Sequence, residues 1–167
     1  MSRWRPPTAP SSPYITAEGR ARLKAEFEQL WHQRRPEVVR ALAAAAAEGD
    51  RSENAEYQYR KKELREIDGR LKYLTTRLEV VRVVPAVDPA GRVVFGAWVE
   101  VADGEGQERC FRIVGADETD AARGWISVDS PVARALIGQT AGAVVRVQLP
   151  AGPVDYEILD IRAAADR

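Results

Sequence analysis

Apolar residues recur with two different periods along this chain, and the period changes at about residue 85. From residue 16 to residue 84 the spacing is three or four residues, which places the apolar side chains on one face of an α-helix. The apolar positions of the first helical segment are Leu23, Phe27, Leu30, Val38, Leu42 and Ala45. Those of the second segment are Tyr57, Leu64, Ile67, Leu71, Leu74, Leu78 and Val81. The second set has the alternation that is typical of a coiled-coil seam. We therefore predict two long helices that run antiparallel, because the connection between them is short.

Local signals mark where the first helix begins and where it changes. Thr16 has a side chain that can cap a helix start, and Glu18 suits the positive end of the helix dipole. Pro36 lacks a backbone N–H, so it should bend or locally break the helix. In the second helix, Gly69 costs about 1 kcal/mol relative to alanine. The hairpin nevertheless remains the prediction for residues 15–84.

After a linker at residues 85–91, the apolar residues alternate with polar ones. This period of two predicts strands at residues 92–95, 98–101, 108–114, 125–128, 144–149 and 156–161. One short helix is predicted at residues 130–137, because Ser130 is a good cap and Pro131 suits the first helical position. The expected fold class is α+β. It consists of a flexible tail at residues 1–14, an antiparallel coiled-coil hairpin at residues 15–84, and a small antiparallel β domain at residues 92–167.

Composition narrows the class of protein without identifying a function. The 167 residues carry no net charge, so overall charge predicts no affinity for nucleic acid. The single cysteine, Cys110, excludes an internal disulfide framework and a thiolate metal cluster. The first residues lack the apolar run of a signal peptide, and no segment approaches the about 20 apolar residues of a membrane span. We expect a cytoplasmic protein without a membrane partner.

The connection between the two helical segments is rich in acids. Asp50 and Glu53 stand three residues apart, with Glu48 and Glu56 close by in the sequence. Mg²⁺ usually keeps several waters and takes one or two carboxylates together with phosphate oxygens, so this pair looks like half of a magnesium site. Cleavage of a phosphodiester by two metals needs a second ion and an activated water, which a partner would supply. The other interpretation is a capping box, with Asp50 as the cap of the second helix and Glu53 in its first turn.

A basic cluster follows the acids along the second helix. Its members and the aromatic residues beside them are Tyr57, Tyr59, Arg60, Lys61, Lys62 and Arg65. Lys61 and Arg65 are four residues apart and share one helix face. Cations beside aromatic rings are suited to binding single-stranded nucleic acid. The alternative is a solvated helix face whose cations pair with neighbouring acids.

Six segments of the chain carry motifs that occur together in one known family. The most specific are Gly-Asp-Arg-Ser-Glu-Asn-Ala-Glu-Tyr-Gln-Tyr at residues 49–59 and Phe-Gly-Ala-Trp-Val-Glu at residues 95–100. The other segments are residues 35–38, 61–68, 111–115 and 126–136. Together they resemble the bacterial Gre transcript cleavage factors, and most closely the GreB branch. The resemblance extends from about Ile15 to Ile161.

The resemblance implies that this chain acts through RNA polymerase. Gre factors have an N-terminal antiparallel coiled coil and a C-terminal domain similar to FK506-binding proteins, which docks at the rim of the polymerase secondary channel. The coiled coil enters the channel, and the tip acids, here Asp50 and Glu53, help to hold the second Mg²⁺ and orient the attacking water. The polymerase then cleaves the extruded 3′ end of a backtracked RNA, and elongation restarts. By this resemblance the chain is not itself an enzyme and has no cofactor of its own, since the Mg²⁺ is shared with the polymerase.

The resemblance also assigns residues that contact the partners. Lys61 and Lys62 match the basic patch that holds the displaced RNA, and we add Arg65 because it shares a face with Lys61. The docking segment for the polymerase matches three consecutive residues, Asp129, Ser130 and Pro131. We expect the protein to be a monomer.

The sequence departs from the family pattern at the alanine run of residues 43–47, at Gly69 and at residues 140–143, and none of these includes a tip acid. Three other functions are weighed against this one, and the first of them is kept as the alternative. A channel-binding inhibitor would have the same fold, although intact Asp50 and Glu53 argue against it. A peptidyl-prolyl isomerase would share the C-terminal fold, but fold does not imply function. An autonomous nuclease would need a third ligand or a general base besides the two acids.

Overall fold

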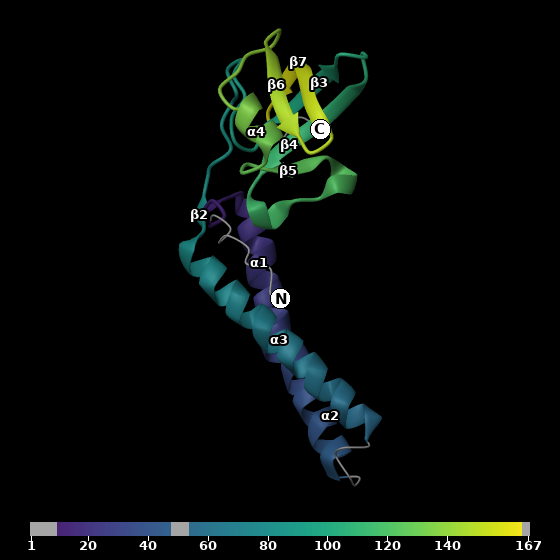
Figure 1. The fold of residues 1–167 in the computed structure, drawn as a ribbon. Coiled ribbons are helices and arrows are strands. Elements are labelled where there is room, and N and C mark those ends of the chain that lie inside the picture. Colours follow the sequence, from purple (N-terminus) through teal and green to yellow (C-terminus); the bar gives the residue numbers. More distant parts are fainter. Residues whose placement is uncertain (1–9, 48–53, 165–167) are drawn as a thin grey trace. The chain divides into compact units, whose positions relative to one another are not determined.

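The computed structural model describes residues 10–47 and 54–164, which fall into two compact units. One unit is the helical segment Arg20–Val81. The other joins the residues up to Gly19 with those from Arg82 onward. These limits differ from the predicted boundaries at residues 15 and 84, because both ends of the hairpin segment contribute a short strand to the second unit. The elements are labelled in Figure 1.

The helical unit contains most of α1 (Ala17–Gln29), a π-helical turn (Leu30–Arg34), α2 (Arg35–Ala47) and the whole of α3 (Ala55–Val80). The π turn ends two residues before Pro36, as expected for a residue that cannot continue the α-helical hydrogen-bond pattern. The Arg35 N–H donates to the Leu30 carbonyl oxygen, five residues back. The predicted local break at Pro36 is therefore confirmed as one wide turn between α1 and α2.

Helices α2 and α3 lie side by side and bury the predicted seam (Figure 1). Val38, Ile67 and Leu71 form the buried centre of this contact. Phe27, Leu30 and Leu64 pack around them. Ion pairs between described residues also link the two arms of the hairpin outside this apolar strip, among them Glu26–Arg70, Arg34–Glu63 and Arg35–Asp68. The seam read from the sequence is thus the surface along which the hairpin closes.

The second unit is built on a five-stranded sheet with the strand order β5-β4-β3-β7-β6. The strands are β3 (Trp98–Asp103), β4 (Glu108–Val114), β5 (Trp125–Ser127), β6 (Val144–Leu149) and β7 (Gly152–Arg162). Neighbouring strands are antiparallel except β4 and β5, which are parallel. The predicted antiparallel sheet is confirmed except at this one pair. The reason is the ten-residue connection between them, long enough to return the chain to the end where β4 began.

The strand predicted at residues 92–95 is not formed as a regular strand. Its alternating pattern is real, but the backbone of Val93 bonds to an irregular segment: its N–H donates to Gln139 O at 2.8 Å, and its carbonyl accepts from Gly138 N at 2.8 Å. Positive φ angles at Gly91 (81°) and Gly96 (87°) turn the chain on either side. The alternating apolar and polar residues at 92–95 therefore reflect the burial of Val93 and do not mark a strand.

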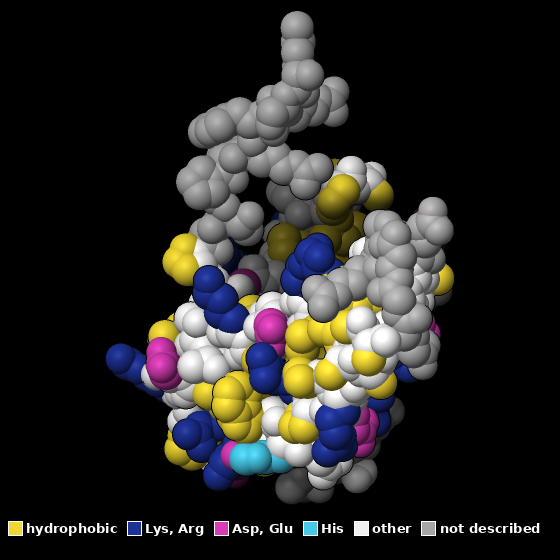
Figure 2. Space-filling model, turned by 90° about the horizontal axis from the view of Figure 1, so that it is seen from below, with side chains coloured by type: hydrophobic (Ala, Val, Ile, Leu, Met, Phe, Trp, Pro, Cys, Tyr) yellow, Lys and Arg dark blue, Asp and Glu magenta, His cyan; other side chains and the backbone are white. Residues whose placement is uncertain are grey.

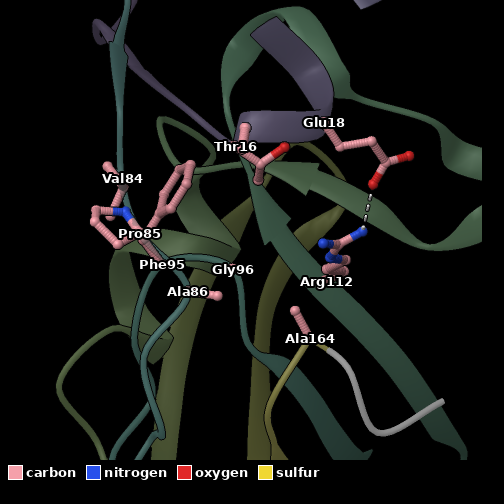
Figure 3. A pocket seen from close by; sticks show the side chains of 10 residues that line it. Thr16, Glu18, Val84, Pro85, Ala86, Phe95, Gly96, Arg112 and Ala164 are labelled. Atoms are coloured by element: carbon pink, nitrogen blue, oxygen red, sulfur yellow. Dashed lines mark ion pairs between the residues drawn. The ribbon is translucent and has the colours of Figure 1, made fainter. Parts of the chain in front are cut away.

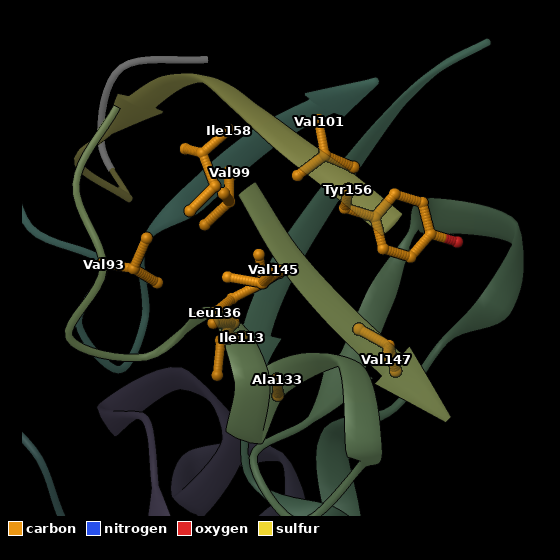
Figure 4. Packing of buried hydrophobic residues seen from close by; sticks show 10 residues of the cluster. All are labelled: Val93, Val99, Val101, Ile113, Ala133, Leu136, Val145, Val147, Tyr156 and Ile158. Carbon is orange, nitrogen blue, oxygen red and sulfur yellow. The ribbon is translucent and has the colours of Figure 1, made fainter. Parts of the chain in front are cut away.

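The core of this unit lies between the sheet and helix α4 (Pro131–Leu136), as Figure 4 shows. Ala133 and Leu136 of α4 are fully buried against it. The strands contribute Val99, Val101, Ile113, Val145, Val147, Tyr156 and Ile158. All of these are β-branched or aromatic, which suits a pleated surface that is half covered. Since the unit has its own apolar core, it does not depend on the hairpin seam for burial.

A parallel pair of short strands, β1 (Tyr14–Ile15) and β2 (Arg82–Val83), joins the two ends of the hairpin segment. Immediately after β1, the Thr16 hydroxyl accepts from Gly19 N–H at 3.0 Å and caps α1, as predicted. The buried carboxylate of Glu118, only 3% exposed, accepts from Thr16 N–H at 2.9 Å, from Gly115 N–H at 3.0 Å and from the Thr16 hydroxyl. The start of α1 is thus fixed to the β domain by one carboxylate.

Candidate functional site

The acidic connection leaves α2 at Ala47 and enters α3 at Ala55. The side-chain amide of Asn54 bonds to both helices that flank this connection, through its oxygen and its nitrogen. Its Oδ1 accepts from Tyr57 N–H at 3.0 Å, which caps α3, and its Nδ2 donates to Ala45 O at 2.9 Å. The capping role proposed for Asp50 is therefore wrong, since Asn54 is an equally good cap and lies next to the first helical residue.

The tip acids Asp50 and Glu53 lie outside the described residues, between the two helix ends that Asn54 connects. Their assignment as catalytic and metal-binding residues stays a prediction. Two carboxylates have the oxygen chemistry that Mg²⁺ prefers, but they are fewer than a complete ligand set. Within residues 10–47 and 54–164, no group of three or more His, Cys, Asp or Glu side chains is placed to hold a metal ion.

The basic residues beyond the tip differ in how they are engaged. Lys61 is exposed, with its Nζ 5.9 Å from the centre of the Tyr57 ring. Lys62 is also exposed and lies 3.9 Å from the Glu66 carboxylate, a weak ion pair. Arg65 is exposed on the same helix face as Lys61. All three cations are accessible to a partner.

Arg60 instead forms ion pairs with acidic residues of its own helix. Its Nε lies 2.7 Å from Glu56, and its Nη1 lies 3.0 Å from Glu63. The hydrogen bonds that Arg60 donates to these two carboxylates, Glu56 foremost, raise the pKa of its guanidinium above the usual value. The Glu63 carboxylate likewise raises the pKa of Arg34 across the hairpin. Arg60 therefore stabilises α3 near its first turns and is less available to a partner than Lys61, Lys62 and Arg65.

Positive charge is not gathered into one large patch on the face shown in Figure 2. Lys and Arg side chains are interspersed there with acidic and hydrophobic ones. This agrees with a formal net charge of zero. This face therefore offers no broad basic surface to a nucleic acid.

The predicted docking residues lie together at the start of α4. The Ser130 hydroxyl caps the helix by accepting from Ala133 N–H at 3.1 Å, and Pro131 occupies the first helical position. The Asp129 carboxylate accepts from the backbone N–H of Ser12 at 2.9 Å and from its hydroxyl. Asp129 and Ser130 thus have internal partners, while Pro131 is exposed. Their role in docking stays a prediction.

One surface feature of the hairpin was missed in the sequence. The rings of Phe27 and Trp31 stack with their centres 6.2 Å apart, and the guanidinium of Arg35 lies 5.8 Å from the Trp31 ring. Trp31 remains 49% exposed. The spacing of four residues between Phe27, Trp31 and Arg35 was the signal that could have revealed this stack.

Comparison with known proteins finds one family along nearly the whole chain. The family model of the N-terminal domain of the transcription elongation factors GreA and GreB matches residues 13–83, and the model of their C-terminal domain matches residues 88–163. Together these two matches cover the hairpin, both short strands and the β domain.

Individual relatives extend the comparison. Transcription elongation factor GreB of Xanthomonas axonopodis pv. citri is 59% identical over 167 residues, covering 99% of both chains. GreB of Pseudomonas aeruginosa is 54% identical over 164 residues, covering 96% of both chains. Among solved structures, GreA factor homolog 1 of Thermus thermophilus is 24% identical, with a TM-score of 0.41 over 89% of this chain and 97% of that one.

Proposed function

Because the chain belongs to the GreA/GreB family of transcription elongation factors, we propose that it rescues arrested RNA polymerase by stimulating cleavage of backtracked RNA. It is a transcription elongation factor of the transcript-cleavage type, and it interacts with RNA polymerase. In this proposal the polymerase performs the cleavage and the chain is not itself catalytic. The protein acts as a monomer in the cytoplasm.

The observation that carries the proposal is the pair of hydrogen bonds by which Asn54 links the two helices on either side of the acidic connection. The Asn54 side chain joins α2 to α3 by its contacts to Ala45 O and Tyr57 N–H, so the two helix ends on either side of the acidic connection are held together. An α-helix rises about 1.5 Å per residue, so the 26 residues of α3 span roughly 39 Å. A thin hairpin of this length is suited to deliver two carboxylates into a channel that admits no globular domain.

Asp50 and Glu53 would complete a site on the polymerase. Bound Mg²⁺ would supply charge neutralisation at the phosphate and activation of a water. The two carboxylates of this chain would contribute oxygen ligands and orient that water by accepting hydrogen bonds from it. The exposed Lys61, Lys62 and Arg65 would hold the displaced RNA 3′ end by its phosphates.

The β domain would provide the attachment to the rim of the polymerase secondary channel. The proposed contact is the turn at Asp129, Ser130 and Pro131. Its internal hydrogen bonds, from Ser12 to Asp129 and from Ala133 N–H to Ser130, fix this turn before a partner arrives. A turn that is already ordered loses little conformational entropy on binding.

The test separates cleavage from binding. Asp50→Ala, Glu53→Ala and the double variant are compared with Glu79→Ala, which removes an exposed acid from the last turn of α3. Release of short 3′ RNA fragments is measured on backtracked complexes, and affinity for the polymerase is measured separately. We expect the tip variants to lose fragment release while keeping polymerase affinity, and Glu79→Ala to keep both. Undiminished fragment release with the double variant would refute the proposed role of the acids.

A further inference from the structure

A cavity of about 180 Å³ lies inside the unit that contains the β domain (Figure 3). Its walls come from residues 16–18 at the start of α1, residues 84–86 after β2, Phe95–Gly96, Arg112 of β4 and Ala164. None of the residues assigned above to the tip, to RNA contact or to docking lines it. The cavity is therefore a feature that the proposed function does not use.

The cavity has an apolar body and one cationic wall. Val84, Pro85, Ala86 and Phe95 supply hydrocarbon surface on one side in Figure 3. Arg112 lies on the other side, with a side chain that is only 12% exposed. Thr16 and Glu18 add polar groups to the lining, and apolar walls with a few positioned polar groups are characteristic of sites that bind small molecules.

Arg112 keeps hydrogen-bonding capacity in this position. Its guanidinium stacks on Trp125, with 4.7 Å from Cζ to the ring centre. Its Nη1 is 3.7 Å from the carboxylate of Glu18, an ion pair beyond hydrogen-bond length with a partner that is 56% exposed. Its Nε is buried and has no hydrogen-bond partner in the part of the chain that the structure describes. A buried donor without an acceptor is unfavourable, so an oxygen ligand at Arg112 would be stabilising.

We propose that this cavity binds a small organic carboxylate, with the carboxylate at Arg112 and its apolar body against Phe95 and residues 84–86. A cavity of about 150 Å³ lined by apolar side chains holds benzene, so about 180 Å³ accommodates a ring of that size. An arginine fork recognises carboxylate and phosphate alike. The hydrocarbon walls favour the carboxylate, because a monoanion with an apolar body loses less hydration there than inorganic phosphate does.

Glu18 gives the site a built-in competitor. Its carboxylate already faces Arg112, and a bound anion would have to share that cation with it. Replacement by glutamine keeps the size of the side chain and removes the charge. Glu18→Gln is therefore expected to increase the affinity for an anion, which is a direction that simple damage to the fold would not produce.

The experiment is a titration of the full chain with benzoate at millimolar concentrations, followed by calorimetry and by NMR of the arginine side chains. We expect benzoate to shift the Arg112 Nε resonance and to bind more tightly to Glu18→Gln than to the parent. Arg112→Gln should weaken binding by about tenfold or more, since it removes a charge-assisted contact. Arg109→Gln, an exposed arginine on the same strand, is the matched control and should leave the affinity unchanged.

Arg112→Gln also removes the stacking of Arg112 on Trp125, so a second variant is needed that leaves this contact in place. Ala86→Leu fills the apolar part of the cavity, leaves Arg112 in place, and should also abolish benzoate binding. Three results would overturn the proposal. They are no detectable binding of benzoate to the parent and to Glu18→Gln, an unchanged affinity in Arg112→Gln, and an equal affinity for inorganic phosphate.

Discussion

Removal of the Glu118 carboxylate should destabilise the protein far more than removal of any exposed acid. In the structure this carboxylate accepts from two backbone N–H groups, those of Thr16 and Gly115, and from the Thr16 hydroxyl. Glu118→Ala leaves both N–H groups without this acceptor, at about 1–3 kcal/mol each, so we expect a loss of roughly 3–5 kcal/mol. Glu118→Gln keeps one oxygen for the N–H groups and loses the charge, so about 1–2 kcal/mol is expected.

The same contact explains why residue 19 is glycine, and it supplies a sharper version of the test. A Cβ at Gly19 would lie 2.1 Å from Glu118 Oε1, so Gly19→Ala should destabilise the parent. In the Glu118→Ala background the obstacle is gone, and the same change should stabilise by up to about 1 kcal/mol, because alanine is the better helix former. The sign of the effect of Gly19→Ala therefore reverses between the two backgrounds.

Urea unfolding followed by tryptophan fluorescence measures these changes, since Trp98 and Trp125 are buried in the same unit as Glu118. Glu105→Gln, an exposed acid in the turn after β3, is the control and should stay within about 0.5 kcal/mol of the parent. If Glu118→Ala also stays within that range, or if Gly19→Ala has the same sign in both backgrounds, the carboxylate does not hold the start of α1.

Three further predictions concern the hairpin. Asn54→Ala should cost about 1 kcal/mol through loss of the cap, while Asn54→Asp should keep the cap and lose only the bridge to α2, as thermal unfolding followed by circular dichroism will show. Val38→Ala should cost about 2 kcal/mol in urea unfolding, because Val38 is 1% exposed, whereas its neighbour Val39 at 39% exposure should tolerate the same change; equal losses would contradict the proposed seam. A double-mutant cycle on Arg35 and Asp68 should give less than about 1 kcal/mol and decrease with added salt, since the pair is exposed; a larger, salt-independent value would contradict this.

The hairpin was largely predictable because its helices and caps are determined by residues that are close together in the sequence. Period and spacing identified Ile67 and Leu71 as core positions, and both are buried. The cap at Thr16 was equally visible, since capping depends on a residue and its immediate neighbours. The cap of α3 was misplaced at Asp50 because several residues of the connection can cap a helix, and the sequence does not show where the first helical turn closes.

The β domain was predictable in its strands and less so in how they pair. Alternation located β3, β4, β6 and β7, but the parallel pairing of β5 with β4 depends on the path of a connection and not on a local pattern. The burial of Glu118 was also hidden. A glutamate in a polar loop looks solvated until the fold brings Thr16, 102 residues away in sequence, against it.

The parallel pairing of Tyr14 with Arg82 and of Ile15 with Val83 makes the hairpin a topological insertion into the β domain. The chain leaves and re-enters that domain at adjacent points, and the domain keeps a core of its own. Matched deletions or additions in the two arms can therefore lengthen or shorten the hairpin without altering the scaffold from which it departs. The length of the hairpin and the structure of the domain that anchors it can thus be changed independently. A foreign helical hairpin grafted between Ile15 and Arg82 would vary the length while keeping the anchoring domain constant.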